Sequence, residues 1–273
     1  MIAAGFAGKL SWLLMMMETE VIRAVMLDIA GVLYEGDRPV SGARQAFSEL
    51  VASGLPLRLV TNSTRRTKRA LIERLLRMGF DVAPEDLFTA PAAAREYLKE
   101  KSLTIYPLIH SALEEEFTDF SAASSNAVLV ADAGDRFVYA NLNKAFRLLM
   151  DGAPLLAIAT NRYFKDEDGL SLDAGPFVRA LEFAADTQAM LFGKPAPAFF
   201  KAVLTDLSCE ASEVVMVGDD VDTDVNGAIA VGIKGILVKT GKYRKGDEDR
   251  MTKGGVAVSD VAAAVERVMS GRA

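Results

Sequence analysis

The sequence of 273 residues has one cysteine, Cys209, and one histidine, His110. A single cysteine excludes an intrachain disulfide and any metal site built from clustered cysteines. A single histidine excludes metal sites with several imidazole ligands, and it leaves one candidate histidine base. Acid–base or metal chemistry in this chain must therefore rest mainly on carboxylates.

The chain also has no excess of positive charge and no long hydrophobic run near its start. The 31 Lys and Arg against 37 Asp and Glu give a net charge of −6, which argues against a nucleic-acid or anionic-membrane partner. The apolar residues 10–17 are too few to span a bilayer, and residues 18–20 make a poor signal-peptide cleavage region. We expect residues 1–20 to form an N-terminal extension, or residues 1–16 to precede the natural start, and the protein to be cytoplasmic.

Hydrophobic residues make up 51% of the chain, enough for a sizeable core, and their spacing alternates between two patterns. Short apolar runs typical of buried strands alternate with stretches of helical periodicity. This alternation predicts an α/β fold with a doubly wound parallel sheet flanked by helices. The expected strands are 21–28, 55–60, 103–109, 127–131, 155–159, 190–192, 214–217 and 235–238, and the expected helices include 41–53, 64–78, 141–150, 176–185, 198–207 and 259–269.

Polar side chains follow four of the apolar runs, and in open parallel sheets ligands bind beyond the carboxyl ends of the strands. The combination suits metal-assisted phosphoryl transfer. Carboxylates can hold Mg²⁺ or attack phosphorus, while a hydroxyl and an ammonium can hold the phosphoryl oxygens. The four groups are Asp28; Thr61, Asn62 and Ser63; Lys194 between Gly193 and Pro195; and Asp219, Asp220, Asp222 and Asp224.

In their order along the chain, these segments resemble the four motifs of the haloacid dehalogenase superfamily of phosphatases. The resemblance implies that Asp28 is the nucleophile and that Thr61 and Lys194 bind phosphate, with Asn62 either a further phosphate ligand or a helix cap. It also implies a Mg²⁺ cofactor held by Asp28, Asp219 and the main-chain carbonyl of Ala30. Asp220 and Asp224 would be outer carboxylates around that ion, and at least one of the clustered carboxylates would be a cap or a solvated residue.

The spacing of the motifs locates an inserted domain. Asp28 and Thr61 are 33 positions apart and Lys194 and Asp219 are 25 apart, each enough for one helix and one strand, whereas Thr61 and Lys194 are 133 apart. We therefore predict an N-terminal extension 1–20, a core formed by 21–88 and 191–273, and an α/β cap at 89–190. This arrangement resembles subfamily IIA, whose cap is of the C2 type. Residues 143–150, 173–184, 193–200 and 237–244 further resemble its branch of phospholysine, phosphohistidine and inorganic pyrophosphate phosphatases.

Residue 30 departs from the superfamily pattern, which usually has a second Asp two positions after the nucleophile to protonate the leaving group. Ala30 cannot transfer a proton, and general acid–base catalysis is typically worth about 10²–10⁴-fold. A substrate with a good leaving group needs this help less. The sequence therefore favours phosphoramidates or pyrophosphate over alkyl phosphates.

The function predicted is a Mg²⁺-dependent phosphohydrolase that acts through an aspartyl-phosphate on a small phosphorylated substrate. By resemblance, a homodimer through the cap is expected. One alternative is a catalytically weak protein of the same fold that binds a phosphorylated ligand or regulates a partner. Another is a carbon–phosphorus hydrolase, because such relatives carry Ala at this motif position. They place their cap between the first two motifs, where this chain has no room for one.

Overall fold

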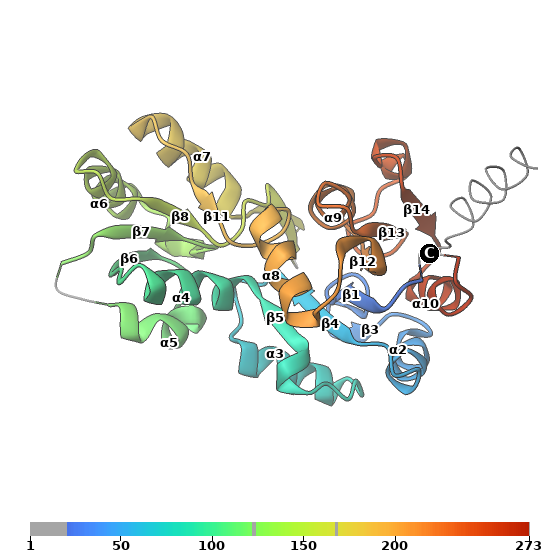
Figure 1. Cartoon of the computed structure of the whole chain (residues 1–273). Coiled ribbons are helices and arrows are strands. Elements are labelled where there is room, and N and C mark those ends of the chain that lie inside the picture. Colours follow the sequence, from blue (N-terminus) through green and yellow to red (C-terminus); the bar gives the residue numbers. More distant parts are fainter. Residues whose placement is uncertain (1–20, 122–123, 167–168, 273) are drawn as a thin grey trace, which may run out of the picture.

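The structure, a computed structural model, describes residues 21–121, 124–166 and 169–272, so the predicted extension 1–20 lies outside the described residues. Two lobes, a core and a cap, each contain a parallel sheet (Figure 1). The α/β fold class predicted from the sequence is confirmed. The core sheet has the order β14 (Gly255–Val258), β13 (Lys234–Val238), β12 (Val214–Gly218), β1 (Ala24–Asp28), β4 (Leu57–Thr61) and β5 (Leu87–Thr89), and all its strand pairs are parallel.

Helices cover both faces of the core sheet, which explains why β1 is apolar at every position before Asp28. Val25 and Leu27 pack in a cluster with α2 (Ala43–Ala52), α3 (Lys68–Arg77) and α10 (Val261–Met269). Ala24 and Met26 point to the other face and pack with α8 (Pro197–Leu207) and α9 (Gly227–Ile229). A strand buried on both sides needs a continuous hydrophobic run, and this is what the sequence provides.

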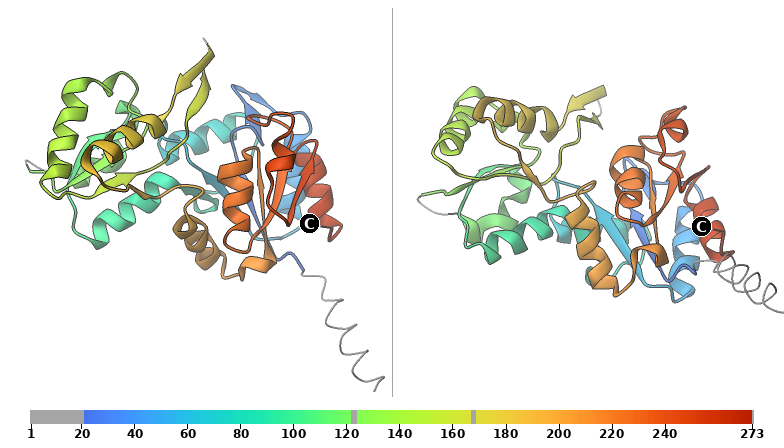
Figure 2. Two further views of the ribbon diagram at one scale, coloured as in Figure 1. Left: turned by 90° about the horizontal axis from the view of Figure 1, so that it is seen from above. Right: turned by 45° about the horizontal axis from the view of Figure 1, so that its top comes forward.

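The cap, green and yellow in Figures 1 and 2, contains a second parallel sheet. Its order is β11 (Met190–Leu191), β8 (Leu155–Ala157), β7 (Ala127–Val130) and β6 (Ile105–Leu108). An antiparallel hairpin, β9 (Tyr163–Asp166) with β10 (Gly169–Leu172), projects from the cap toward the core (Figure 2). The cap helices are α4 (Ala90–Glu100), α5 (Glu114–Phe117), α6 (Tyr139–Met150) and α7 (Ala174–Ala185).

The structure assigns one expected strand to the cap sheet and adds elements that the sequence patterns did not indicate. The run 190–192, expected to be a strand, forms β11, which pairs with β8 of the cap. The core gains β5 and β14, and the cap gains α4 and the hairpin. We place the crossings between the lobes at residues 89–90 and 191–192, close to the predicted 89–190. The smaller elements are η1 (Pro84–Asp86), η2 (Ser111–Leu113), η3 (Thr118–Phe120), η4 (Gly134–Arg136), η5 (Ala211–Glu213) and η7 (Asp247–Arg250).

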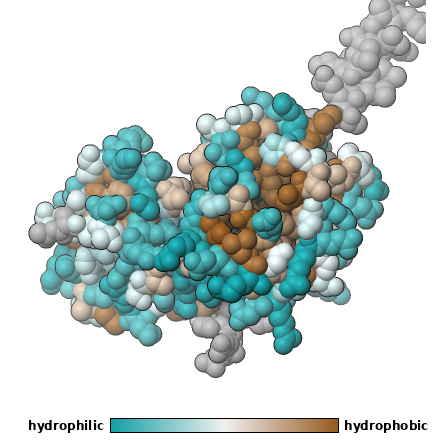
Figure 3. Space-filling model, turned by 90° about the horizontal axis from the view of Figure 1, so that it is seen from below, coloured by the Kyte–Doolittle hydropathy of each residue, from teal (hydrophilic) through white to brown (hydrophobic). Residues whose placement is uncertain are grey.

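Between Asp28 and Thr61 the chain forms only α2, β4 and a small hairpin of β2 (Tyr34–Glu35) and β3 (Arg38–Pro39). The cap is therefore not inserted there, which weighs against the carbon–phosphorus hydrolase alternative. None of the described helices is long and apolar enough to cross a membrane. On the face shown in Figure 3 the cap surface is mainly hydrophilic, and hydrophobic residues gather in a patch on the core.

Candidate active site

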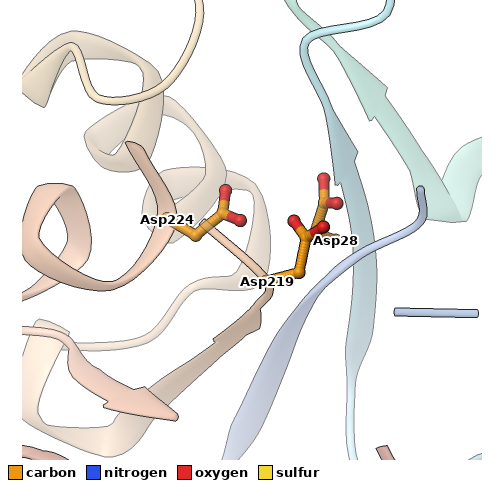
Figure 4. Close-up of side chains that lie close together, drawn as sticks. All are labelled: Asp28, Asp219 and Asp224. Atoms are coloured by element: carbon orange, nitrogen blue, oxygen red, sulfur yellow. The ribbon is translucent and has the colours of Figure 1, made fainter. Parts of the chain in front are cut away.

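Three neighbouring core strands bring the predicted site residues to one edge of the sheet. Asp28 is the last residue of β1 and Thr61 the last of β4, while Asp219 follows β12 directly. Because β1 lies between β12 and β4 and all three run parallel, their carboxyl ends meet. Asp224 reaches the same place from the helical turn η6 (Val221–Asn226), which follows β12 (Figure 4).

Three buried carboxylates form the centre of this site. Asp28, Asp219 and Asp224 are 7%, 1% and 2% exposed, and each offers an oxygen within 4.8 Å of the others. Burial, followed by repulsion from Asp28 and Asp224, raises the pKa of Asp219 well above its usual range. Burial also raises the pKa of Asp224, although the neighbouring Lys194 ammonium opposes this. The cluster thus concentrates negative charge where little water can screen it.

Lys194 supplies a buried positive charge to the same cluster. Its Nζ lies 2.5 Å from Asp28 Oδ1 and 2.7 Å from Asp224 Oδ1, and it also donates to the Val60 carbonyl at 3.3 Å. Burial alone would lower the pKa of Lys194, but Asp224 and Asp28 more than offset this and raise it. Lys194 is therefore a fixed cation between the two carboxylates.

Asn62 holds the main chain of Lys194 from a position 132 residues away in the sequence. Its Nδ2 donates to the Lys194 carbonyl (2.7 Å), and its Oδ1 accepts from the Lys194 amide (2.8 Å). Gly193 makes this approach possible, because a Cβ there would lie 2.4 Å from Asn62 Oδ1. Asn62 thus positions Lys194, and its predicted contact with phosphate stays a prediction. Thr61 is buried, with Oγ1 accepting from the Ser63 amide (3.1 Å).

The remaining clustered carboxylates differ in their surroundings. Asp220 Oδ1 accepts from the amides of Asp222 and Thr223 at 3.1 and 3.0 Å, so this side chain caps η6. Asp222 is exposed and pairs with Arg250. The sequence left open which of these residues were caps or solvated, and the structure shows a cap at Asp220 and a surface ion pair at Asp222.

Ala30 lies in the loop after β1, between two buried neighbours, Ile29 and Gly31, yet it is itself exposed. The side chain at this position is a methyl group, whereas the superfamily pattern has a carboxylate there. His110, the chain's one histidine, lies in the cap, where its Nδ1 accepts from the Ala112 amide (3.2 Å). Residue 30 therefore offers no acid at this edge of the core sheet, and the chain's one histidine lies in the cap with its Nδ1 engaged.

The loop after β13 completes the site, although no chemical motif in the sequence assigned a role to its residues. The Thr240 hydroxyl donates to the Gly31 carbonyl (2.5 Å), and the Lys242 amide donates to Asp219 Oδ2 (2.7 Å). Gly31 and Gly241 enclose the Asp219 carboxylate, since a Cβ at either would lie within 2.0 Å of Oδ2. The sequence feature that pointed to this loop was the resemblance of residues 237–244 to known phosphatases, and that resemblance did not say what the residues do.

These residues fit a divalent cation with oxygen ligands. Asp219 Oδ1 is buried with no hydrogen-bond partner, and such an orphaned acceptor is costly unless a ligand satisfies it. When fully ionised, the carboxylates of Asp28, Asp219, Asp220 and Asp224 exceed the nearby ammoniums of Lys194 and Lys242 by two charges. A hard dication is the species that such a set of oxygen atoms prefers.

The chain has a Rossmann-like parallel α/β core, with a carboxylate and a lysine paired at the carboxyl end of its first strand. The comparisons give the family. Residues 25–122 match the model for haloacid dehalogenase-like hydrolases, and residues 191–264 match a second model, for hydrolases resembling this group. The chain belongs to the haloacid dehalogenase-like hydrolases, as the four motifs predicted, and it is a hydrolase of the phosphatase type.

Two relatives resemble the chain over most of its length. Haloacid dehalogenase-like hydrolase domain-containing protein 2 of Rattus norvegicus is 45% identical over 231 residues, covering 85% of this chain and 89% of the relative. Phospholysine phosphohistidine inorganic pyrophosphate phosphatase of Danio rerio is 41% identical over 258 residues, covering 92% and 96%. Both belong to the branch that residues 143–150, 173–184, 193–200 and 237–244 resemble.

Solved structures share the two-lobed fold. A p-nitrophenyl phosphatase from Archaeoglobus fulgidus has a TM-score of 0.82 and 25% identity, covering 90% of this chain and 99% of its own. The 4-nitrophenylphosphatase of Thermotoga maritima has a TM-score of 0.83, with coverages of 92% and 98%. At 23% identity the second likeness concerns the fold alone. The predicted Rossmann-like core with an inserted cap is thus confirmed.

Proposed function

We propose that the protein is a Mg²⁺-dependent phosphohydrolase that acts through an aspartyl-phosphate on Asp28. The observation that carries the proposal is the buried contact between Asp28 Oδ1 and Lys194 Nζ at 2.5 Å, beside Asp219 and Asp224. It gives one carboxylate a fixed position, a counter-ion and a place at the edge of the sheet where ligands bind. Asp28, Asp219 and the main-chain carbonyl of Ala30 would hold Mg²⁺, which when bound offsets charge on the phosphoryl oxygens.

In the first step an oxygen of Asp28 attacks phosphorus, and the bond from phosphorus to the leaving group breaks with its electron pair going to that group. The Lys194 ammonium and the Thr61 hydroxyl hold the phosphoryl oxygens as charge develops. In the second step water attacks phosphorus and the bond from phosphorus to the Asp28 oxygen breaks with its electron pair going to Asp28. Inorganic phosphate leaves with the protons of the water, and the Asp28 carboxylate is restored. Asp224 holds Lys194 in place throughout.

The substrate class follows from Ala30. No side chain at this position can protonate the leaving group, so we infer a small substrate whose leaving group departs readily. A phosphoramidate whose nitrogen is already protonated leaves as a neutral amine, and pyrophosphate leaves as a stabilised oxyanion, so both meet this condition. The Danio rerio relative bears the name phospholysine phosphohistidine inorganic pyrophosphate phosphatase, which agrees with this class. We further propose a cytoplasmic location and a homodimer through the cap, where Tyr139 and Phe183 are exposed by 82% and 91%.

The test is release of inorganic phosphate from phosphoramidates, pyrophosphate and alkyl phosphates, with Mg²⁺ and with EDTA. Wild type should release phosphate only with Mg²⁺, and Asp28→Asn should lower kcat by more than about 10³-fold. Asp222→Asn is the matched control, because that exposed carboxylate pairs with Arg250 outside the cluster. Full activity of Asp28→Asn would refute the mechanism.

The second candidate function is binding of a phosphorylated ligand without appreciable turnover, and Ala30 is the observation that favours it. Calorimetry with inorganic phosphate and Mg²⁺ separates the two functions. Binding by wild type, combined with phosphate release no greater than that of Asp28→Asn, would identify a binding protein.

A further inference from the structure

A second lysine faces the carboxylate cluster from the mouth of the site. Lys242 Nζ lies 3.7 Å from Asp220 Oδ2, and the side chain is 48% exposed. Lys194 is the inner cation, with its side chain 2% exposed and bound between Asp28 and Asp224. The site thus has one cation enclosed by carboxylates and another whose side chain is about half exposed to solvent.

The main chain places Lys242 firmly. Its amide donates to Asp219 Oδ2 at 2.7 Å, the preceding Gly241 amide donates to Glu35 Oε1 at 2.6 Å, and the Thr240 hydroxyl donates to the Gly31 carbonyl at 2.5 Å. Gly241 lies so close to the loop after β1 that a Cβ there would be 2.4 Å from the Gly31 Cα. The main chain of Lys242 is therefore tied both to the loop after β1 and to Asp219, so its side chain starts from a fixed point beside the cluster.

The carboxylate beside Lys242 suits a charged ammonium, because Lys242 Nζ lies 3.7 Å from Asp220 Oδ2. A lysine ammonium is a poor proton donor at neutral pH, so Lys242 does not replace the acid that Ala30 lacks. What it offers is a permanent positive charge.

We propose that Lys242 is a second substrate-binding cation of this site, which attracts the phosphorylated substrate from the solvent side while Lys194 binds its phosphoryl group beside the inner carboxylates. This inference rests on the proposed function. A cation so placed repels Mg²⁺ and attracts phosphate. Removing its charge must therefore shift the affinities for the two ligands in opposite directions, and a merely structural residue would not do this.

Lys242→Met tests the proposal, because it removes the ammonium and keeps the amide that binds Asp219. Interactions between partly exposed charges change affinity by about two- to five-fold. The variant should bind Mg²⁺ about two- to five-fold more tightly. At saturating Mg²⁺ it should bind inorganic phosphate more weakly by a similar factor. Both are read by calorimetry without turnover, and KM for the substrate should rise with little change in kcat.

Lys242→Arg should restore both affinities. Lys245→Met, which removes an exposed lysine of the same loop, should change neither and controls for net charge. Unchanged affinities for Mg²⁺ and phosphate in Lys242→Met would overturn the proposal. Weaker binding of both ligands would also overturn it, because it would indicate a distorted site. Failure of the proposed function would show differently, as wild type that binds both ligands and releases no phosphate.

Discussion

Single residues decide the chemistry of this site, and Ala30 is the clearest case. Asp28, Lys194 and Asp219 are the proposed nucleophile, its counter-ion and a candidate metal ligand, but each is buried and held by its contacts. Ala30 is exposed in the loop directly after Asp28, so a larger side chain can be accommodated there. Adding the missing carboxylate at this position therefore tests whether protonation of the leaving group limits the reaction.

Ala30→Asp should raise kcat/KM for alkyl phosphates by roughly 10²-fold or more, and for phosphoramidates much less. An alkoxide gains most from a proton donor, whereas a protonated phosphoramidate already leaves as a neutral amine. The measurement is kcat/KM for both substrate classes at matched Mg²⁺, with Ala30→Asn as the uncharged control. An equal gain for both classes would contradict the argument, because it would locate the limitation in hydrolysis of the aspartyl-phosphate.

At the scale of elements, several helices begin with a side chain that accepts from their own first turn. Thr67 caps α3, Thr89 caps α4, Asp173 caps α7 and Asp260 caps α10. Asp173 differs from the other carboxylate cap because it is 7% exposed. Burial raises its pKa, and the nearby charge of Asp132 adds to this. The α7 cap therefore has a cost in desolvation, which an amide cap avoids.

Asp173→Asn should make the protein more stable at pH 7, since Asn caps helices as well as Asp does. The folded-state pKa of Asp173 lies above its unfolded value, so the folded wild type binds the proton more tightly. Protonation of Asp173 through that range favours the folded wild type, whereas the introduced asparagine does not titrate. The difference in stability between the two proteins should therefore shrink as pH falls toward about 4. Urea unfolding at several pH values measures this. An advantage independent of pH would contradict the assignment, and Asp260→Asn controls for the change of cap.

At the scale of the whole molecule, side chains on both faces of the β9–β10 hairpin connect the cap to the core. Arg65, in the loop after β4, pairs with the buried Asp132 of the cap and stacks on the Phe164 ring with its guanidinium carbon 4.2 Å from the centroid. Arg244, after β13, stacks on Tyr163 at 5.1 Å. Successive side chains of a strand point to opposite sides, so β9 contacts two separate core loops. These contacts fix the cap over the edge where Asp28 lies.

Arg65→Ala should lower the free energy of unfolding by about 1–3 kcal/mol, because it leaves the Asp132 carboxylate buried without this partner. Arg69→Ala is the matched control. That side chain is 73% exposed and its ion pairs lie on the surface, so its loss should change stability by less than about 0.5 kcal/mol. Denaturant unfolding of both variants measures the difference. Equal stabilities would show that the Arg65 pair contributes nothing.

Local patterns in the sequence were enough to predict most strands and helices of the core. The apolar run that ends at Asp28 is buried on both faces of the sheet, and 214–217 and 235–238 became β12 and β13 with shifts of one residue. Short strands with weaker patterns, such as β5 and β14, were not predicted. The sheet that the run 190–192 joins was not predicted, because a strand's own residues do not state which neighbour it pairs with.

The sequence by itself determined the kinds of chemical group at the site and their order along the chain. Both follow from residue identity and from the apolar runs that form buried strands. Tertiary structure decided which groups meet. The Asn62 amide binds Lys194 across 132 positions, and the Lys242 amide binds Asp219 across 23. Such contacts depend on how strands align and loops cross, and no local pattern encodes them. The same reason explains why Asp220 proved to be a cap while Asp224 pairs with Lys194.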